Sequence, residues 1–284
     1  MLPRFFGDAG RQLFGVYHPA SATPARRDGV VLCYPGPQEY RQAHWAYRRL
    51  AALLAARGMH VLRFDYGGTG DSAGEAAEGS VTRWVEDVGT AVQELQDVAG
   101  VRRVALVGMR LGAVVAVRAC AAGLAVSDLV LWDPVVRGAE YLAGLDAEQA
   151  AGLGDRAYPE DDRRGVDELL GYVMTPAMRA ETGALDLTAE GCGAPGRVLL
   201  VAADSGPEYA ELGGVWAARG VACEVRHVAD ATLARGGHWA SDTLVARHIP
   251  GAIDAFFAER PAERAAVQRA QPIARRTAEP PAHV

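Results

Sequence analysis

The chain has 284 residues, of which half are apolar and 23% are charged, and its formal net charge is −6. This length and composition suit a globular domain with one sizeable core. The negative charge argues against nucleic-acid binding as the main activity. The sequence has no run of about 18 apolar residues and no apolar N-terminal stretch, so we expect no membrane span, no signal peptide and a cytoplasmic location.

The side chains that hold metals or form Schiff bases are sparse. The chain has no lysine, which excludes Schiff-base chemistry through that residue. The four cysteines, at positions 33, 120, 192 and 223, form no C-x-x-C pair and have no metal-ligand spacing with histidine. We therefore expect small buried thiols, no metal and no cofactor.

Strand and helix patterns alternate along the chain. Residues 4–6 and 12–18 are typical of a leading hairpin. Short apolar runs rich in β-branched residues then predict buried strands at 29–34, 59–64, 103–107, 129–132, 197–202 and 222–228. Helical spacing predicts helices at 43–57, 81–98, 111–122, 207–219 and 241–257. This alternation predicts an α/β fold with a mostly parallel central sheet, helices on both faces and the antiparallel hairpin at one edge.

Two stretches fall outside this alternation. Residues 137–190 separate two expected strands by too great a length for a simple crossover, so we interpret them as a small helical cap insertion. The Ala-, Arg- and Pro-rich tail, residues 259–284, has little to bury and is expected to be disordered. The chain would then be one domain, residues 1–258, followed by this tail.

The segment Gly108-Met109-Arg110-Leu111-Gly112 joins an expected strand to an almost wholly apolar helix. A strand, a sharp glycine-flanked turn and a helix form the context of the G-x-S-x-G nucleophile elbow. Here the glycines have the required spacing, but the central residue is an arginine.

Four segments carry a resemblance to a known family: residues 34–39 (YPGPQE), 65–72 (DYGGTGDS), 108–112 (GMRLG) and 236–238 (GGH). Over roughly residues 4–258 the chain resembles the α/β hydrolases of the serine-aminopeptidase-like group. Within that group it is most similar to exosortase-system-associated hydrolases, some of which also carry arginine at the elbow. The resemblance implies the α/β-hydrolase fold and an ester, thioester or amide substrate.

The resemblance also implies a catalytic triad in the chain order nucleophile, acid, histidine. The nucleophile position falls on Arg110, the acid on Asp204 after the strand at 197–202, and the base on His238. Asp133, at the end of another strand, is the alternative acid. Ser72 is a weaker candidate for a displaced nucleophile, since an Asp-Ser pair more often closes a turn.

An arginine at the elbow changes the chemistry. The guanidinium stays protonated at biological pH, so Arg110 can neither attack a carbonyl nor act as a base. It lies at an expected helix N-terminus, where free N–H groups favour an anion, and its donors suit a carboxylate or an oxyanion. The alternative is an ion pair with a nearby carboxylate such as Asp204 or Asp133.

The oxyanion donors are altered as well. In the family one donor is the N–H after the nucleophile, which here is that of Leu111. The other comes from the loop after the first buried strand, where Pro35 and Pro37 have no N–H to give. Gly36 or Gln38 would have to supply it.

Two hypotheses remain. In the first the protein is an enzyme without a covalent step: His238, polarised by Asp204, acts as general base, and Arg110 with the Leu111 N–H holds the anion. In the second it is a pseudohydrolase that binds an acyl or anionic ligand or a protein partner. We expect a small acyl or carboxylate compound as the ligand, with a carrier protein as a further partner and no nucleic acid.

Overall fold

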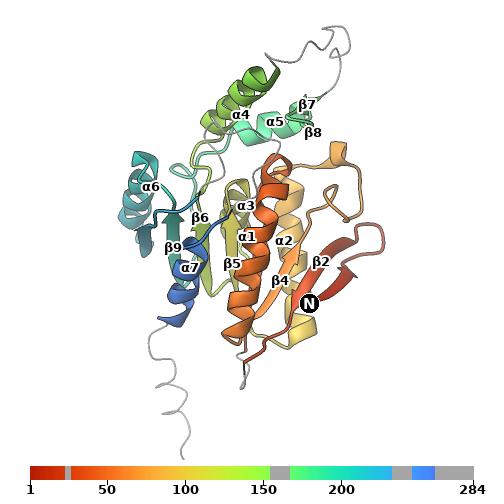
Figure 1. Cartoon of the computed structure of the whole chain (residues 1–284), viewed down its shortest axis with the longest axis vertical. Helices are drawn as coiled ribbons and strands as arrows, with labels where there is room; N and C mark the ends of the chain where they lie inside the picture. The colour runs from red at the N-terminus through yellow and green to blue at the C-terminus, as the bar shows by residue number, and fades with distance from the viewer. Residues whose placement is uncertain (23–26, 154–166, 232–244, 260–284) are drawn as a thin grey trace, which may run out of the picture.

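The computed structural model of the chain describes residues 1–22, 27–153, 167–231 and 245–259. Within them an eight-stranded sheet has the order β1-β2-β4-β3-β5-β6-β9-β10. Helices cover both of its faces, and a separate group of two helices and a short hairpin lies beyond one end of the sheet (Figure 1).

The sheet combines an antiparallel edge with a parallel body, as predicted. β1 (Leu2–Phe6) and β2 (Leu13–His18) form the leading hairpin, and β2 pairs antiparallel with β4 (His60–Phe64). The strands that follow pair in parallel from β4 to β10. Their bounds are β3 (Asp28–Cys33), β5 (Arg103–Met109), β6 (Asp128–Trp132), β9 (Arg197–Ala202) and β10 (Cys223–His227). Every residue of β3 is buried, which explains the apolar run Val30–Cys33 that makes up most of it.

The helices form two layers. α1 (Pro37–Ala56) packs against α7 (Ile249–Ala258) in front of the sheet, and α2 (Val81–Ala99) packs against α3 (Leu111–Ala121) behind it (Figure 1). α6 (Pro207–Ala218) covers β9 and β10. α3 is apolar on all sides because it lies between the sheet and α2.

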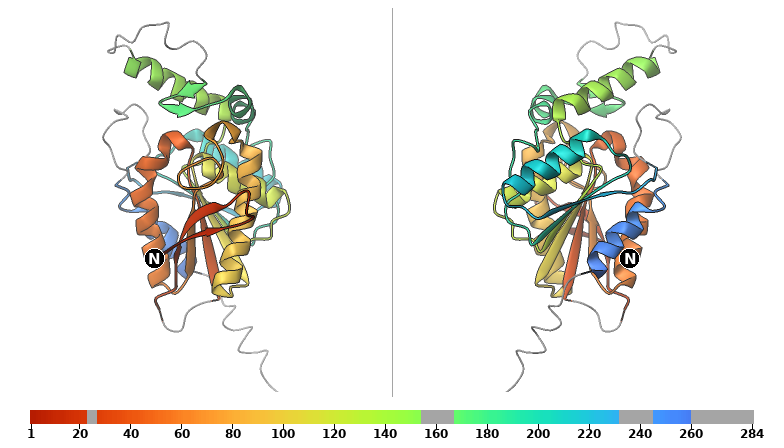
Figure 2. Two further views of the ribbon diagram at one scale, coloured as in Figure 1. Left: turned by 90° about the vertical axis from the view of Figure 1, so that its right-hand side faces the viewer. Right: turned by 90° about the vertical axis from the view of Figure 1, so that its left-hand side faces the viewer.

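The insertion forms a cap. It contains α4 (Gly138–Leu153) and α5 (Pro176–Gly183), and a bridge between Arg137 and Asp186 closes its base. Figure 2 shows the cap above one end of the sheet from both sides. A short hairpin of β7 (Glu168–Leu169) and β8 (Tyr172–Val173) adds a feature that the helical interpretation did not include. The tail beyond residue 259 lies outside the described residues.

Two predicted helix boundaries were wrong. The first helix begins at Pro37 rather than at residue 43, because Gly36 serves as N-cap and proline is well suited to the first helical position. This places Gln38 and Glu39 on the first turn of α1. The last helix begins at Ile249 rather than at residue 241: residues 245–248 are not helical, and 241–244 lie outside the described residues.

Candidate functional site

The junction between β5 and α3 has the backbone of a sharp elbow. Arg110 is the N-cap of α3, with φ 53° and ψ −121°, a conformation that costs an L-residue about 1–3 kcal/mol. Its flanking glycines leave no room for side chains: a Cβ on Gly112 would lie 2.1 Å from the carbonyl oxygen of Tyr34, and one on Gly108 would lie 2.4 Å from the oxygen of Gly112. The two glycines are therefore required by close backbone approach.

The Arg110 side chain pairs with Glu39 on the first turn of α1. Its Nε donates to Glu39 Oε1 at 3.0 Å and its Nη1 donates to the main-chain oxygen of Asp133 at 3.2 Å. Tyr141 of the cap helix α4 completes the cluster: its hydroxyl donates to Glu39 Oε2 at 3.1 Å, and its ring centroid lies 5.5 Å from the guanidinium carbon. Arg110, Glu39 and Tyr141 thus join the elbow, α1 and the cap, and we call them the elbow cluster.

This arrangement differs from the ion pair that the sequence suggested. Arg110 contacts the main chain of Asp133 rather than its carboxylate, and its carboxylate partner is Glu39. The side chains of Arg110 and Glu39 are only 19% and 7% exposed. Burial alone would lower the pKa of Arg110, but the charge of Glu39, the electrostatic interactions with Tyr141 and Tyr209 and the hydrogen bond to Glu39 together outweigh it, and the pKa is raised. Glu39 was not singled out from the sequence, although its place in the loop after the first buried strand was a usable signal.

Asp133 and Asp204 follow neighbouring strands, β6 and β9. Asp133 is buried, has φ 42° and accepts a hydrogen bond from the Ala203 N–H at 2.7 Å. Burial raises the pKa of the Asp133 carboxyl to about 6; the Ala203 bond and Arg110 oppose this rise, and the charge of Asp204 adds to it. Asp204 Oδ1 accepts from the Gly206 N–H at 3.1 Å. The two carboxylates thus lie close enough to affect each other's ionisation, at the carboxyl ends of two neighbouring strands.

His238 lies outside the described residues, so its place relative to Asp204 is a prediction. The flanks of its segment are fixed by Asp230. This carboxylate accepts hydrogen bonds from the main-chain N–H groups of Arg247, His248 and Ile249 at 2.7 to 2.8 Å. It joins the end of one flank to the start of α7.

The expected oxyanion donors gather around Gly36. Leu111 is the first residue of α3, where helix geometry leaves the N–H without an intrahelical acceptor. An added Cβ on Gly36 would lie 3.3 Å from Gln38 Oε1, 3.4 Å from the Tyr141 hydroxyl and 3.5 Å from Leu111 Cδ2. Gln38 is buried, and its Nε2 has no hydrogen-bond partner among the described residues. Gly36, Gln38, Leu111 and the elbow cluster therefore form one neighbourhood.

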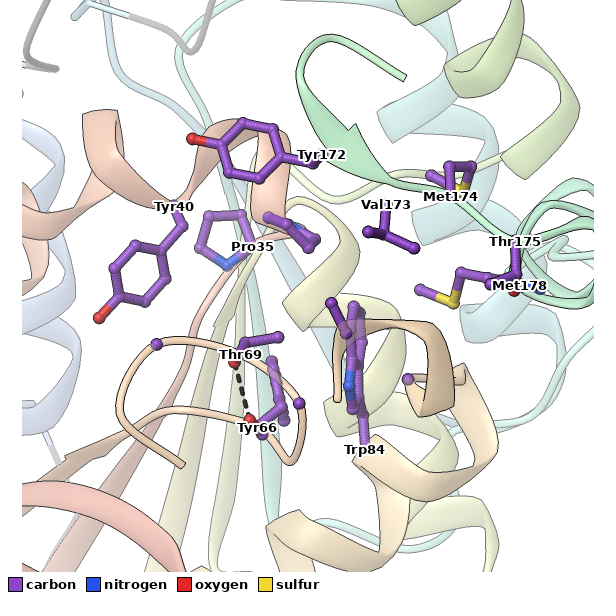
Figure 3. Close-up of a pocket in the computed structure, with 15 residues that line it drawn as sticks. Pro35, Tyr40, Tyr66, Thr69, Trp84, Tyr172, Val173, Met174, Thr175 and Met178 are labelled. Atoms are coloured by element: carbon purple, nitrogen blue, oxygen red, sulfur yellow. Dashed lines mark hydrogen bonds between the residues drawn. The ribbon is translucent and has the colours of Figure 1, made fainter. Parts of the chain in front are cut away.

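A pocket of about 290 Å³ adjoins this neighbourhood under the cap hairpin. Figure 3 shows Trp84 and Tyr66 below, Tyr172 and Val173 above, and Met178 to one side. Arg110 and Asp133 are not among its lining residues; Pro35 and Pro37, which flank Gly36, are. The pocket wall is formed by Pro35, Pro37, Tyr40, Tyr66, Gly68, Thr69, Gly70, Ala76, Gly79, Trp84, Tyr172, Val173, Met174, Thr175 and Met178.

Ser72 and the cysteines, the weaker candidates for a chemical role, make contacts typical of structural residues. The Ser72 hydroxyl donates to the main-chain oxygen of Asp65 at 2.6 Å and accepts from the Phe14 N–H at 2.8 Å, so it fastens the 65–72 turn to β2. Cys33, Cys120 and Cys192 are buried. In the described part of the chain, no group of three His, Cys, Asp or Glu side chains is arranged to hold a metal ion. Over the same residues, every helix is too short or too polar to cross a bilayer.

Residues 25–165 match the family described as serine aminopeptidase, S33. No curated protein sequence matches the chain significantly.

Among solved structures, the chain is similar to Est1E from Butyrivibrio proteoclasticus with bound ferulic acid, at 15% identity and a TM-score of 0.63 over 90% of this chain and 98% of that one. It is also similar to mouse alpha/beta hydrolase domain-containing protein 10, at 18% identity and 0.57 over 91% and 97%. The bottromycin epimerase BotH, in complex with bottromycin A2, gives 19% identity and 0.51 over 80% and 90%. The fold is therefore the α/β-hydrolase fold, with a mostly parallel sheet and a cap.

Proposed function

We propose that the protein acts on an acyl compound, an ester, thioester or amide, without a serine nucleophile. His238, polarised by Asp204, takes a proton from water or from the substrate, and no acyl-enzyme forms at the elbow. We also propose that it belongs with the exosortase-system-associated hydrolases and that it works in the cytoplasm. The acyl group would occupy the pocket under the cap hairpin.

The observation that carries this proposal is the partner of Arg110. Because its charge is balanced by Glu39, it does not bind the carboxylate of Asp204 or of Asp133. Arg110 therefore does not compete with His238 for the carboxylate of Asp204 or for that of Asp133. Had Arg110 paired with Asp204, the base would have lost its acid.

The same pair limits what Arg110 can offer a substrate. Nε and Nη1 are engaged, so Nη2 is the nitrogen of the fork that no described residue binds. We propose that Nη2 and the Leu111 N–H face the developing oxyanion, with Gly36 or Gln38 as the second main-chain donor. Donors held in place before the reaction need no reorganisation, which is the main source of their catalytic value.

The reaction need not be hydrolysis. One of the similar structures is that of an epimerase, BotH, which supports considering reactions other than hydrolysis on this fold. A base with an adjacent oxyanion site can also remove a proton next to a carbonyl. Lyase, cyclisation and epimerisation reactions therefore belong to the same proposal as hydrolysis without an acyl-enzyme.

A pseudohydrolase is the second candidate, and the elbow cluster is the observation that favours it. The buried Arg110–Glu39 pair and its hydrogen bond from Tyr141 can have a purely structural role, which is to hold the cap against the core. In that case the pocket would bind an acyl or anionic ligand, a carrier protein that presents one, or another protein partner, without turnover.

Turnover of a panel of activated esters and thioesters separates the two candidates. The enzyme hypothesis predicts that His238→Ala lowers kcat at least about 100-fold, the usual size of a general-base contribution. It also predicts that Arg110→Met lowers kcat while the ligand still binds. His248→Ala is the matched control, since His248 lies at the N-cap of α7, and its activity should stay near wild type. Full activity in both His238→Ala and Arg110→Met would exclude the enzyme hypothesis.

A further inference from the structure

A second cavity, of about 40 Å³, lies between the leading hairpin and α1. Arg63 of β4 lines it, directly opposite Val16 of β2 in the sheet register, so both side chains project from the same face of the sheet. Arg63 is only 5% exposed. An arginine is almost never buried to this extent without a partner of opposite charge. The neighbours of this guanidinium therefore decide what the cavity can bind.

The direct partners of Arg63 carry no charge. Its Nε donates to His18 Nε2 at 3.1 Å, and its Nη1 donates to the Tyr34 hydroxyl oxygen at 2.7 Å. Burial, followed by the charge of Arg63, lowers the pKa of His18 to about 4, so this ring is neutral at pH 7. Within the described part of the chain, Arg63 forms no ion pair, and neither its Nη2 nor the hydroxyl hydrogen of Tyr34 has an acceptor. Two donors are thus left over.

These donors are open to the cavity. Arg63 and Tyr34 both line it. The unpaired side-chain atoms that are sealed from solvent in the described residues include Gln38 Nε2 and Trp84 Nε1, but not Arg63 Nη2. Because Nη2 has no protein partner either, part of its surface is accessible to a small ligand.

The carboxylate of Asp65 lines the same cavity but is bonded elsewhere. Its Oδ1 accepts a hydrogen bond from the Tyr40 hydroxyl at 2.7 Å, and its Oδ2 accepts one from the Asp71 N–H at 3.1 Å. Asp65 therefore reduces the positive potential of the cavity at longer range without serving as the counter-ion of Arg63.

Arg48, which is exposed on α1, supplies a second positive charge. After burial and the charge of Arg63, the charge of Arg48 also lowers the pKa of His18 and of His44, a further residue of the cavity wall. Two arginines against the single carboxylate of Asp65 leave these surroundings net positive, which favours an anion.

The size of the cavity restricts the anion. A volume of about 40 Å³ is roughly three times the space that one water needs, so a carboxylate group fits and a larger oxyanion such as a phosphate ester does not. Guanidinium and hydroxyl donors suit the two oxygens of a carboxylate. The partly exposed side chains of Phe14 and Val16 offer an apolar wall to the carbon that carries it.

We propose that this cavity is a binding site for a small carboxylate, with acetate as the simplest member of the class. Arg63 Nη2 donates to one carboxylate oxygen, the Tyr34 hydroxyl donates to the other, and the methyl group lies against Phe14 and Val16. The site is separate from the elbow cluster and does not rest on the proposed function. Tyr40 connects the two regions, because it lines both this cavity and the pocket under the cap hairpin.

Fluoroacetate and fluoroacetamide test the proposal by fluorine NMR titration. The two compounds have nearly the same shape, but only the acid is charged at pH 7. Wild-type protein should bind fluoroacetate with a Kd on the order of 1–10 mM, as expected for so small a ligand. It should bind fluoroacetamide at least about 10-fold more weakly, because the guanidinium then loses its charged partner.

Three variants locate the site. Arg63→Gln should weaken fluoroacetate at least about 10-fold and make the affinities of acid and amide similar. Tyr34→Phe, which removes only a hydroxyl, should weaken fluoroacetate about 10-fold. Val16→Phe keeps both donors but fills the cavity, and should also weaken fluoroacetate at least about 10-fold. Val16 is only partly buried, so this variant keeps the test valid if Arg63→Gln does not fold.

Two further variants serve as controls. Arg179→Gln removes a cap arginine whose side chain is 41% exposed and pairs with Asp146, and it should leave the fluoroacetate affinity unchanged. Arg110→Met should also leave it unchanged, which separates this site from the elbow.

The proposal is overturned by equal affinities for acid and amide in wild type, by an absence of fluoroacetate binding, or by fluoroacetate binding that survives Arg63→Gln or Val16→Phe. It is also overturned if Arg110→Met alone abolishes binding, or if crystals soaked in acetate show an ordered water only beside Arg63 Nη2. Loss of turnover in His238→Ala with intact fluoroacetate binding is expected, because the carboxylate site does not depend on the reaction.

Discussion

The buried Arg110–Glu39 pair predicts a strongly non-additive set of stability changes. Removing one partner of a buried ion pair leaves an uncompensated charge and typically costs about 3–5 kcal/mol. With 19% and 7% of the two side chains exposed, we take the lower end: Arg110→Met and Glu39→Gln should each lower the free energy of unfolding by about 3 kcal/mol. The double variant removes both charges and should lose about 2 kcal/mol, far less than the sum of about 6.

The strained elbow adds a second, separable contribution. Arg110→Ala and Arg110→Gly both remove the ion pair, but only glycine adopts φ 53° without strain. Arg110→Gly should therefore be about 1 kcal/mol more stable than Arg110→Ala. Urea unfolding with an unchanged m-value measures all of these differences. Single variants within about 0.5 kcal/mol of wild type, or a double variant equal to the sum of the singles, would refute the buried ion pair as a structural element.

Three further predictions concern acidic and hydroxyl side chains. The folded-state pKa of Asp133, about 6, lies above its unfolded value of 3.8, so the folded state holds a proton that the unfolded state has lost, and the free energy of unfolding falls as pH rises from about 4 to 6. Urea unfolding measured over this pH range should show a shallower fall for Asp133→Asn than for wild type. An unchanged slope would contradict the assignment of this pH dependence to Asp133. Asp230→Ala should lower stability by about 1–2 kcal/mol at pH 7. Burial opposes ionisation of Asp230, but hydrogen bonds from the N–H groups of residues 247–249 and of Ala231 outweigh it and lower the Asp230 pKa. The stabilisation by the Asp230 carboxylate is therefore present above its unfolded pKa and is lost as pH falls through its folded pKa. The stabilities of Asp230→Ala and wild type should therefore become equal in acid. Ser72→Ala should cost about 1 kcal/mol of stability, because the Phe14 N–H loses its acceptor, without abolishing turnover; complete loss of activity in a folded Ser72→Ala protein would revive it as a nucleophile.

Much of the fold follows from local pattern. The apolar, β-branched runs predicted six strands of the sheet, because strands buried on both faces have a distinctive composition, and the leading hairpin predicted the other two. The predicted ends of α1, α2, α3 and α6 lie within two residues of a glycine with positive φ: Gly58, Gly100, Gly123 and Gly220. Helix starts were harder. The proline-rich segment 35–37 suggested a loop, whereas Pro37 opens α1.

The site was predictable where it depends on the main chain and unpredictable where it depends on contacts between distant segments. The elbow at Arg110 and the acids at the ends of β6 and β9 follow from strand–turn–helix order. The partner of Arg110 does not, since Glu39 and Tyr141 come from 71 residues before and from the cap after it, and their approach is set by tertiary packing. The same holds for the pocket wall, which residues 76–79, α2 and the cap hairpin form together.

Treatment of active protein with a fluorophosphonate probe tests the central claim most directly, because such probes label only an activated nucleophile. The account predicts that turnover of the best ester or thioester of the panel is unchanged after treatment and that no serine is labelled, since Arg110 occupies the nucleophile position and proton transfer by His238 needs no covalent step. Stoichiometric labelling of any serine, with parallel loss of turnover, would contradict it.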